Sequence, residues 1–225
     1  MNPITLQILL HVAAFALPGL PGVPGVPVKG VTLEASKVAM SASQAARGLQ
    51  ELNVLVNAGN YRDFGFESTD EVRQSTLGTA LPVFMVRLDQ LQQFNGGDAA
   101  ALLVDTDRVL YPVLVGGRVR CSVEVQRRDG VWSLARLGAA QAIRLIDRGL
   151  AAASKASGAP ATDFFQVMVP ALNRVFLGRR APDGLKLTPL LDEAELGLQA
   201  GRPDAAEKVL GVLAPVARMT VDPIR

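Results

Sequence analysis

The apolar side chains of residues 31–58 recur at the spacing of an amphipathic helix. They step by four, three, four, three and four positions, which places them on one stripe of a helix surface. The stripe consists of Val38, Ala42, Ala45, Leu49, Leu52 and Val56. Its alanines predict that another element packs close to this helix, and Gly59-Asn60 marks its end.

Between residues 82 and 137 the pattern becomes that of β-strands. The β-like runs fall at 82–88, 102–104, 109–115, 119–127 and 131–137, with a short helical turn at 89–94. Gly116-Gly117 and Asp129-Gly130 are two-residue hairpin turns, because both positions of each pair tolerate a positive φ. The sequence therefore predicts an antiparallel meander.

The hairpin turns also predict the strand register. They pair Val115 with Arg118 and Arg128 with Val131. One face of the meander then carries an apolar set that we expect to form the core: Leu110, Leu114, Val119, Cys121, Val123, Val125 and Leu134. The other face mixes polar and apolar side chains: Arg118, Arg120, Ser122, Glu124, Tyr111, Val113 and Val115.

This mixed face is the interaction surface that the sequence predicts. A half-apolar patch left open to solvent is typical of a protein interface. We therefore expect Tyr111, Val113, Val115, Arg118 and Arg120 to contact a protein or peptide partner. For the arginines, a solvated outer face is the alternative.

A second amphipathic helix is expected after Gly138, over residues 139–153. We expect it to lie across the core face of the meander, with the first helix beside it. Residues 164–175 also have helical spacing, but Pro170 interrupts them, so a kinked helix and a pair of strands both remain open.

The C-terminal residues carry two further helix signals. Thr188-Pro189 is a cap followed by a proline, which is typical of a helix start. Gly201 ends that helix, and Pro203 begins a last one. The sequence therefore predicts an αα-hairpin here.

Together these elements predict an α+β fold. It consists of an antiparallel β-meander of four to five strands packed on helices, with a C-terminal helical region ending in an αα-hairpin. The expected division is a signal peptide at 1–16, a Pro/Gly-rich tether at 17–30, an α+β domain at 31–158 and a helical region at 159–225.

The N-terminal residues suggest export. An apolar stretch ends in Ala14-Phe15-Ala16, a pattern cleaved by signal peptidase, although no Lys or Arg precedes it. The prolines of residues 17–30 would interrupt a membrane helix and favour an extended spacer; their three Pro-Gly triplets are too few for collagen. We therefore expect a secreted or periplasmic protein with no integral membrane span after processing. A retained anchor and a misassigned start codon are the alternatives.

Composition excludes several kinds of chemistry. The net charge of +2 and the aromatic content of 5% argue against nucleic-acid binding. The only histidine, His11, lies in the expected leader, so a processed chain would lack His-dependent catalysis and His-bearing metal sites. The only cysteine, Cys121, is expected to be a buried thiol. No catalytic residue, metal or cofactor is predicted.

Asp105 and Asp107 are the one carboxylate pair that could act in catalysis. They lie two positions apart beside a strand end, and a pair of carboxylates is what many glycosidases use. Asp-Thr-Asp is also ordinary turn chemistry, which we favour. The sequence thus predicts an exported, non-catalytic domain that binds a protein or peptide. A small-molecule carrier with a pocket between sheet and helices, and a carboxylate-based hydrolase, are the alternatives.

Overall fold

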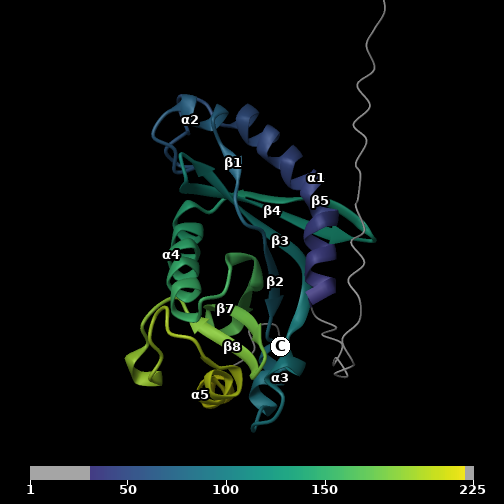
Figure 1. The fold of residues 1–225 in the computed structure, drawn as a ribbon, viewed down its shortest axis with the longest axis vertical. Coiled ribbons are helices and arrows are strands. Elements are labelled where there is room, and N and C mark those ends of the chain that lie inside the picture. The colour runs from purple at the N-terminus through teal and green to yellow at the C-terminus, as the bar shows by residue number, and fades with distance from the viewer. Residues whose placement is uncertain (1–30, 221–225) are drawn as a thin grey trace, which may run out of the picture.

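The computed structural model describes residues 31–220 of the chain, and it has an α+β architecture (Figure 1). The predicted signal peptide and tether lie outside the described residues. The helices are α1 (Val31–Leu55), α2 (Thr69–Arg73), α3 (Leu88–Gln93), α4 (Ala140–Ser157) and α5 (Ala206–Met219). The strands are β1 (Thr76–Leu77), β2 (Leu81–Met85), β3 (Val104–Val115), β4 (Arg118–Arg128), β5 (Val131–Gly138), β6 (Phe164–Val169), β7 (Arg174–Ala181), β8 (Gly184–Pro189) and β9 (Asp204–Ala205).

All nine of these strands belong to one sheet. Its order is β5-β4-β3-β2-β6-β7-β8-β9, and β1 pairs with β3 beyond the end of β2. Only the β2–β6 pair is parallel. The sheet is therefore larger than the predicted four to five strands, because the C-terminal third of the chain adds four strands to it.

The predicted meander is confirmed in β3, β4 and β5. Val115 pairs with Arg118 and Arg128 pairs with Val131, as the Gly-Gly and Asp-Gly turns require. The runs at 102–104 and 109–115, expected to be separate, form the single strand β3 and the residues just before it. The turn chemistry of Asp105-Thr106-Asp107 instead produces a bulge against β2, where Val83 pairs with Arg108 and Phe84 with Asp105.

The predicted helical region at 159–225 is mostly β-structure. Of the two alternatives for residues 164–175, the strands are correct, and Pro170 begins the short 3-10 turn between β6 and β7. Thr188-Pro189 ends strand β8 and starts no helix. Only the second helix of the predicted αα-hairpin is present, as α5.

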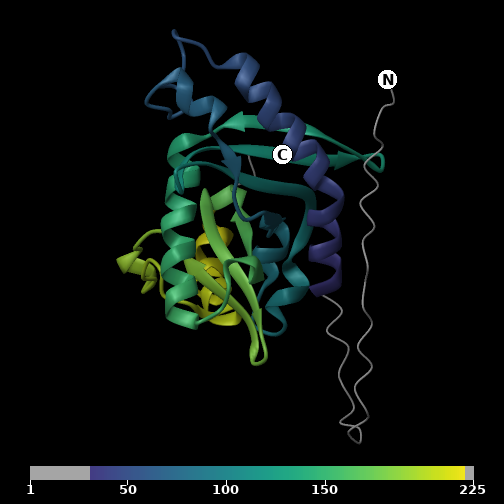
Figure 2. The same cartoon turned by 45° about the horizontal axis from the view of Figure 1, so that its top comes forward.

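Helices cover both faces of the sheet, whereas the sequence predicted one covered face. Over the meander, α1 lies on one face and α4 on the opposite face (Figures 1 and 2). Over β6, β7 and β8, the face opposite α4 is covered by α3 and α5. The expectation that the first two long helices lie side by side is therefore wrong.

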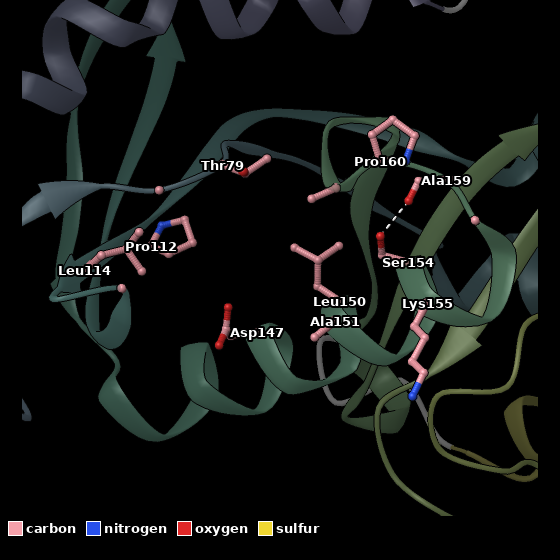
Figure 3. A pocket seen from close by; sticks show the side chains of 14 residues that line it. Thr79, Pro112, Leu114, Asp147, Leu150, Ala151, Ser154, Lys155, Ala159 and Pro160 are labelled. Atoms are coloured by element: carbon pink, nitrogen blue, oxygen red, sulfur yellow. Dashed lines mark hydrogen bonds between the residues drawn. The ribbon is translucent and has the colours of Figure 1, made fainter.

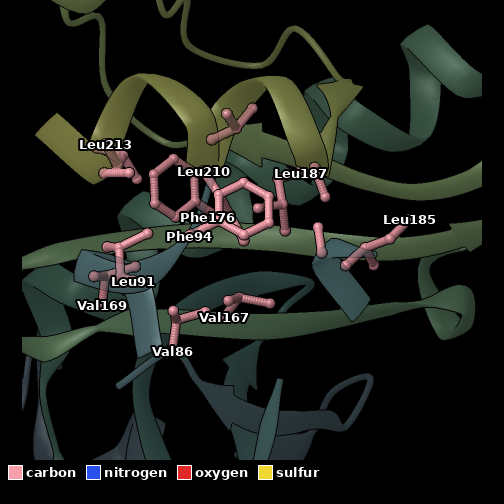
Figure 4. Packing of buried hydrophobic residues seen from close by; sticks show 14 of the residues in the cluster. Val86, Leu91, Phe94, Val167, Val169, Phe176, Leu185, Leu187, Leu210 and Leu213 are labelled. Carbon is pink, nitrogen blue, oxygen red and sulfur yellow. The ribbon is translucent and has the colours of Figure 1, made fainter. Parts of the chain in front are cut away.

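The core follows this layering. In Figure 4, Leu210 and Leu213 of α5 pack with Phe176 of β7 and Leu187 of β8. On the other face, α4 contributes Ile143, Ile146, Leu150 and Ala153 to a cluster that spans both halves of the sheet. In the sequence, α4 follows β5 and leads to β6, so it connects the two halves of the sheet. The same helix also packs on both halves.

Candidate functional site

The predicted interaction surface is covered by the chain itself. Tyr111, Val113 and Val115 are only 5%, 0% and 8% exposed, because α1 packs on them. The Tyr111 hydroxyl lies 2.7 Å from the Ser41 hydroxyl and donates to the Val38 carbonyl at 3.1 Å. The expected exposure of these three residues is therefore wrong.

A single β-bulge explains this difference. Val113 pairs with Cys121 and Leu114 with Val119, so Arg120 is the extra residue on β4. The bulge shifts the alternation by one position. Residues that a regular ladder would place on opposite faces, such as Tyr111 and Val123, therefore share the α1 face.

The two predicted arginines differ in environment. Arg118 is exposed beside the Gly116-Gly117 turn, whereas Arg120 is 8% exposed. Arg120 forms ion pairs with Glu67, at 2.8 Å, and with Glu71 of α2. Burial disfavours its charged form, but the two carboxylates raise the pKa of Arg120 and also lower the pKa of Glu67. Arg120 thus fixes the α2 segment to the sheet.

Asp105 and Asp107 each have a different cationic partner. Asp105 pairs with Lys37 of α1, and Asp107 pairs with Arg127 of β4 at 2.8 Å. Asp105 also accepts the Asp107 backbone N–H at 2.8 Å, which is the local bonding that shapes the bulge. Cys121 is fully buried, and burial raises the pKa of its thiol to about 12. Asp105 and Asp107 thus each form an ion pair, and the Cys121 thiol is enclosed in the core.

A concave feature of the surface lies between α4 and the segment that joins β1 to β2. We call it the α4 groove, and its volume is about 740 Å³. Thr79 and Pro112 line its sheet side, and Asp147, Ala151 and Lys155 line its helix side (Figure 3). Gly78, next to Thr79 in the sequence, also lines the groove. Most of the lining side chains are small, so the chain backbone is close to the groove. Sequence reasoning missed this site because it depends on the two-residue pairing of β1 with β3.

The sheet side of the groove offers unpaired backbone groups. The Gly78 N–H donates to the Pro112 carbonyl at 2.7 Å, so the Gly78 backbone faces β3. Since neighbouring residues of a strand point their polar groups in opposite directions, those of Leu77 and Thr79 face away from β3. Beside β2 that direction is filled by β6, but β6 pairs only with Val83, Phe84 and Met85. Within residues 31–220, β1 has no partner on this side.

Asp147 supplies the groove with an ionisable group. Its carboxylate lies on the α4 wall, and burial raises its pKa. No hydrogen bond or ion pair to its side chain is formed within the described part of the chain. Lys155 lies two helical turns further along α4. The groove is therefore a mostly apolar channel with one acidic and one basic side chain along one wall.

Comparison of the chain with protein-family models, with curated proteins and with solved structures finds no match in any of the three. Among the helices of residues 31–220, none has both the length and the apolar character needed to cross a bilayer. The function is therefore inferred from the geometry of the chain.

Proposed function

We propose that this protein is an exported, non-catalytic domain that binds an extended peptide in the α4 groove. The peptide adds to the sheet as a strand beside β1 and the β1–β2 connection. The observation that carries this proposal is the unpaired backbone of Leu77 and Thr79 next to a groove of about 740 Å³. The apolar N-terminal stretch of the sequence supports export.

Peptide chemistry fits these backbone groups. Leu77 and Thr79 each offer an N–H donor and a carbonyl acceptor, and residues two apart in a strand are separated by about 6.8 Å. A second extended chain presents donors and acceptors at the same repeat, which is the basis of recognition by strand addition. Small molecules do not in general carry polar groups that repeat at this distance.

The groove walls indicate the side chains that the peptide carries. Gly78, Ala151 and Ala159 leave room for apolar side chains on the face turned toward α4. Asp147 lacks a cationic partner among the described residues, so a Lys or Arg of the peptide is favoured opposite it. The partner is thus an extended, mostly apolar segment with one basic residue.

A peptide selection tests this proposal. A random peptide library is selected on the full chain, and each enriched peptide is then measured against variants by fluorescence anisotropy. Ala151→Trp fills the groove, and Thr79→Pro removes one outward N–H. Both are expected to weaken binding at least tenfold. Ala156→Trp is the matched control, because Ala156 is exposed on the same helix and does not line the groove.

Two results would overturn the proposal. One is that no peptide is enriched on the wild-type chain. The other is that enriched peptides bind the Ala151→Trp variant as tightly as the Ala156→Trp variant, which would place them elsewhere. Circular dichroism of each variant identifies loss of binding that comes from unfolding.

A further inference from the structure

A second concave site lies on the α4 face of the meander and shares no lining residue with the α4 groove. It has a volume of about 260 Å³ and is formed by polar side chains of three neighbouring strands. Arg108 of β3 is opposite Gln126 of β4, and Glu124 of β4 is opposite Arg136 of β5. Cross-strand pairing therefore brings side chains from distant parts of the sequence together here. We call it the arginine pocket.

Positive charge exceeds negative charge in the arginine pocket. Arg108, Arg128 and Arg136 line it together with one carboxylate, Glu124. The Glu124 side chain is only 12% exposed, and its oxygens lie 3.2 Å from Arg108 Nη1 and 3.7 Å from Arg136 Nε. Glu124 therefore holds two guanidinium groups in place. Each guanidinium has five N–H donors, so donors remain for a further anion.

The floor of the pocket continues into a smaller apolar cavity of about 100 Å³. The two cavities share Arg108, Glu124 and Arg136. The smaller one is lined by apolar side chains from α4 and from three strands: Ile143, Ile146, Val83, Leu110 and Met168. A cationic opening thus leads to a mostly apolar interior with room for about three water-sized groups.

The side-chain amide of Gln166 also lines the smaller cavity. Gln166 of β6 is 7% exposed, and its side chain forms no hydrogen bond within the described ranges of the chain. Because the cavity reaches the amide atoms, they are not fully enclosed and remain accessible to a bound molecule. Gln166 can supply this hydrogen bond to a polar atom of a ligand in the cavity.

We propose that the arginine pocket and the cavity beneath it bind a short-chain monocarboxylate. The carboxylate lies between Arg108 and Arg136, whose planar guanidinium groups match its two oxygens. Its short hydrocarbon part enters the apolar cavity. A monoanion fits better than a polyanion, because Glu124 stays in the pocket and repels additional negative charge.

Butyrate is the probe that tests this site, with 1-butanol and butylamine as neutral and cationic controls of similar size. The full chain, labelled with ¹⁵N, is titrated and followed by two-dimensional NMR. Butyrate is expected to cause saturable shifts of amides in β3, β4, β5 and β6 around the pocket. The two controls are expected to cause none there at the same concentrations.

Three variants separate binding at this site from general electrostatic attraction. Arg136→Gln is expected to weaken butyrate binding at least fivefold, and its exposed side chain makes misfolding a minor concern. Glu124→Gln removes the competing carboxylate and is expected to strengthen binding. Arg127→Gln is the matched control for Arg136→Gln, because Arg127 lies on the neighbouring strand β4 but contacts Trp132 and Asp107 on the opposite face of the sheet.

The proposal fails if butyrate produces no saturable shifts around the pocket. It also fails if Arg136→Gln and Arg127→Gln weaken binding equally. That result would indicate general electrostatic attraction to the protein and no binding at this pocket. Neither result concerns peptide binding in the α4 groove, so the two proposals are tested separately.

Discussion

Lys37 of α1 forms a salt bridge with Asp105 at the start of β3, on the face of the sheet that α1, α3 and α5 cover. The Lys37 side chain is only 6% exposed, whereas that of Asp105 is 33% exposed. The ammonium nitrogen also lies 5.6 Å from the centre of the Phe84 ring. The lysine is therefore a buried cation that depends on one partly solvated carboxylate.

This asymmetry predicts that the two halves of the ion pair respond differently to substitution. Asp105→Asn leaves a buried ammonium without its counter-ion and is expected to lower the free energy of unfolding by about 2–3 kcal/mol. Lys37→Met removes the buried charge and keeps most of the volume, so it is expected to change that free energy by less than about 1 kcal/mol. Urea unfolding measures both.

The neighbouring carboxylate provides the control for Asp105. Asp107 pairs with Arg127, and both side chains are about two-fifths exposed, at 41% and 40%. Asp107→Asn is therefore expected to cost less than about 1 kcal/mol. Equal losses for Asp105→Asn and Asp107→Asn would contradict the role of Lys37 burial.

Gly48 allows α1 to lie close to the sheet. A Cβ at this position would lie 2.7 Å from Val123 Cγ1 and 2.9 Å from Leu134 Cδ1. Gly48→Ala is expected to destabilise the protein by about 1–2 kcal/mol, because the strain exceeds the gain in helix propensity. Gly211→Ala in α5 is the matched control, since no atom lies within 4 Å of its added Cβ. It should stabilise by about 0.5–1 kcal/mol, and the idea fails if both alanines stabilise.

The raised pKa of Asp147 predicts a dependence of stability on pH. Because burial raises the folded-state pKa above 3.8, the folded chain binds protons more readily than the unfolded chain in the interval between these two values. This group therefore makes the wild type less stable as the pH rises through that interval. Asp147→Asn is expected to be more stable than wild type at pH 7 and no different well below pH 3.8.

Asp183 should show the opposite behaviour. A hydrogen bond from Lys186 lowers the pKa of Asp183, so its contribution is present above 3.8 and is lost as the pH falls through the folded-state pKa. Asp183→Asn is therefore expected to lose stability at pH 7. Thermal unfolding at several pH values measures both variants, and the same sign for both would contradict the assignment.

Cys121 is expected to resist thiol reagents in the folded protein. Its side chain is fully buried and its pKa is raised to about 12, so the thiolate that reacts is scarce at pH 8. Labelling by a disulfide reagent is expected to be slower in the native chain than in the urea-unfolded chain by a factor on the order of 100 or more. Similar rates in the two states would mean that β4 opens readily.

The meander could be predicted from the sequence because short turns between neighbouring strands determine it. Gly116-Gly117 and Asp129-Gly130 determine the turn geometry, and the turns determine the pairing of the residues beside them. The bulge at Arg120 has no such signature. The residues of β4 have the same apolar pattern with or without a bulge at Arg120. The sequence therefore could not show that Tyr111 and Val113 share a face with Cys121 and Val123, which depends on how β3 pairs with β4.

The C-terminal strands were not predicted uniquely because both of their faces are buried. In β6, Phe164 and Met168 pack toward α4 while Phe165 and Val167 pack toward α5. A continuous apolar run of this kind satisfies helical spacing as well as strand spacing. The α4 groove could not be predicted either. Its backbone groups are unpaired because β6 pairs only with Val83, Phe84 and Met85, and this pairing was not predicted.

The parallel contact between β2 and β6 has a consequence for synthesis of the chain. Until residues 164–169 leave the ribosome, Val83, Phe84 and Met85 of β2 have no partner on that side. An apolar strand edge of this kind pairs readily with other chains. Truncated products that end before β6 are therefore expected to aggregate.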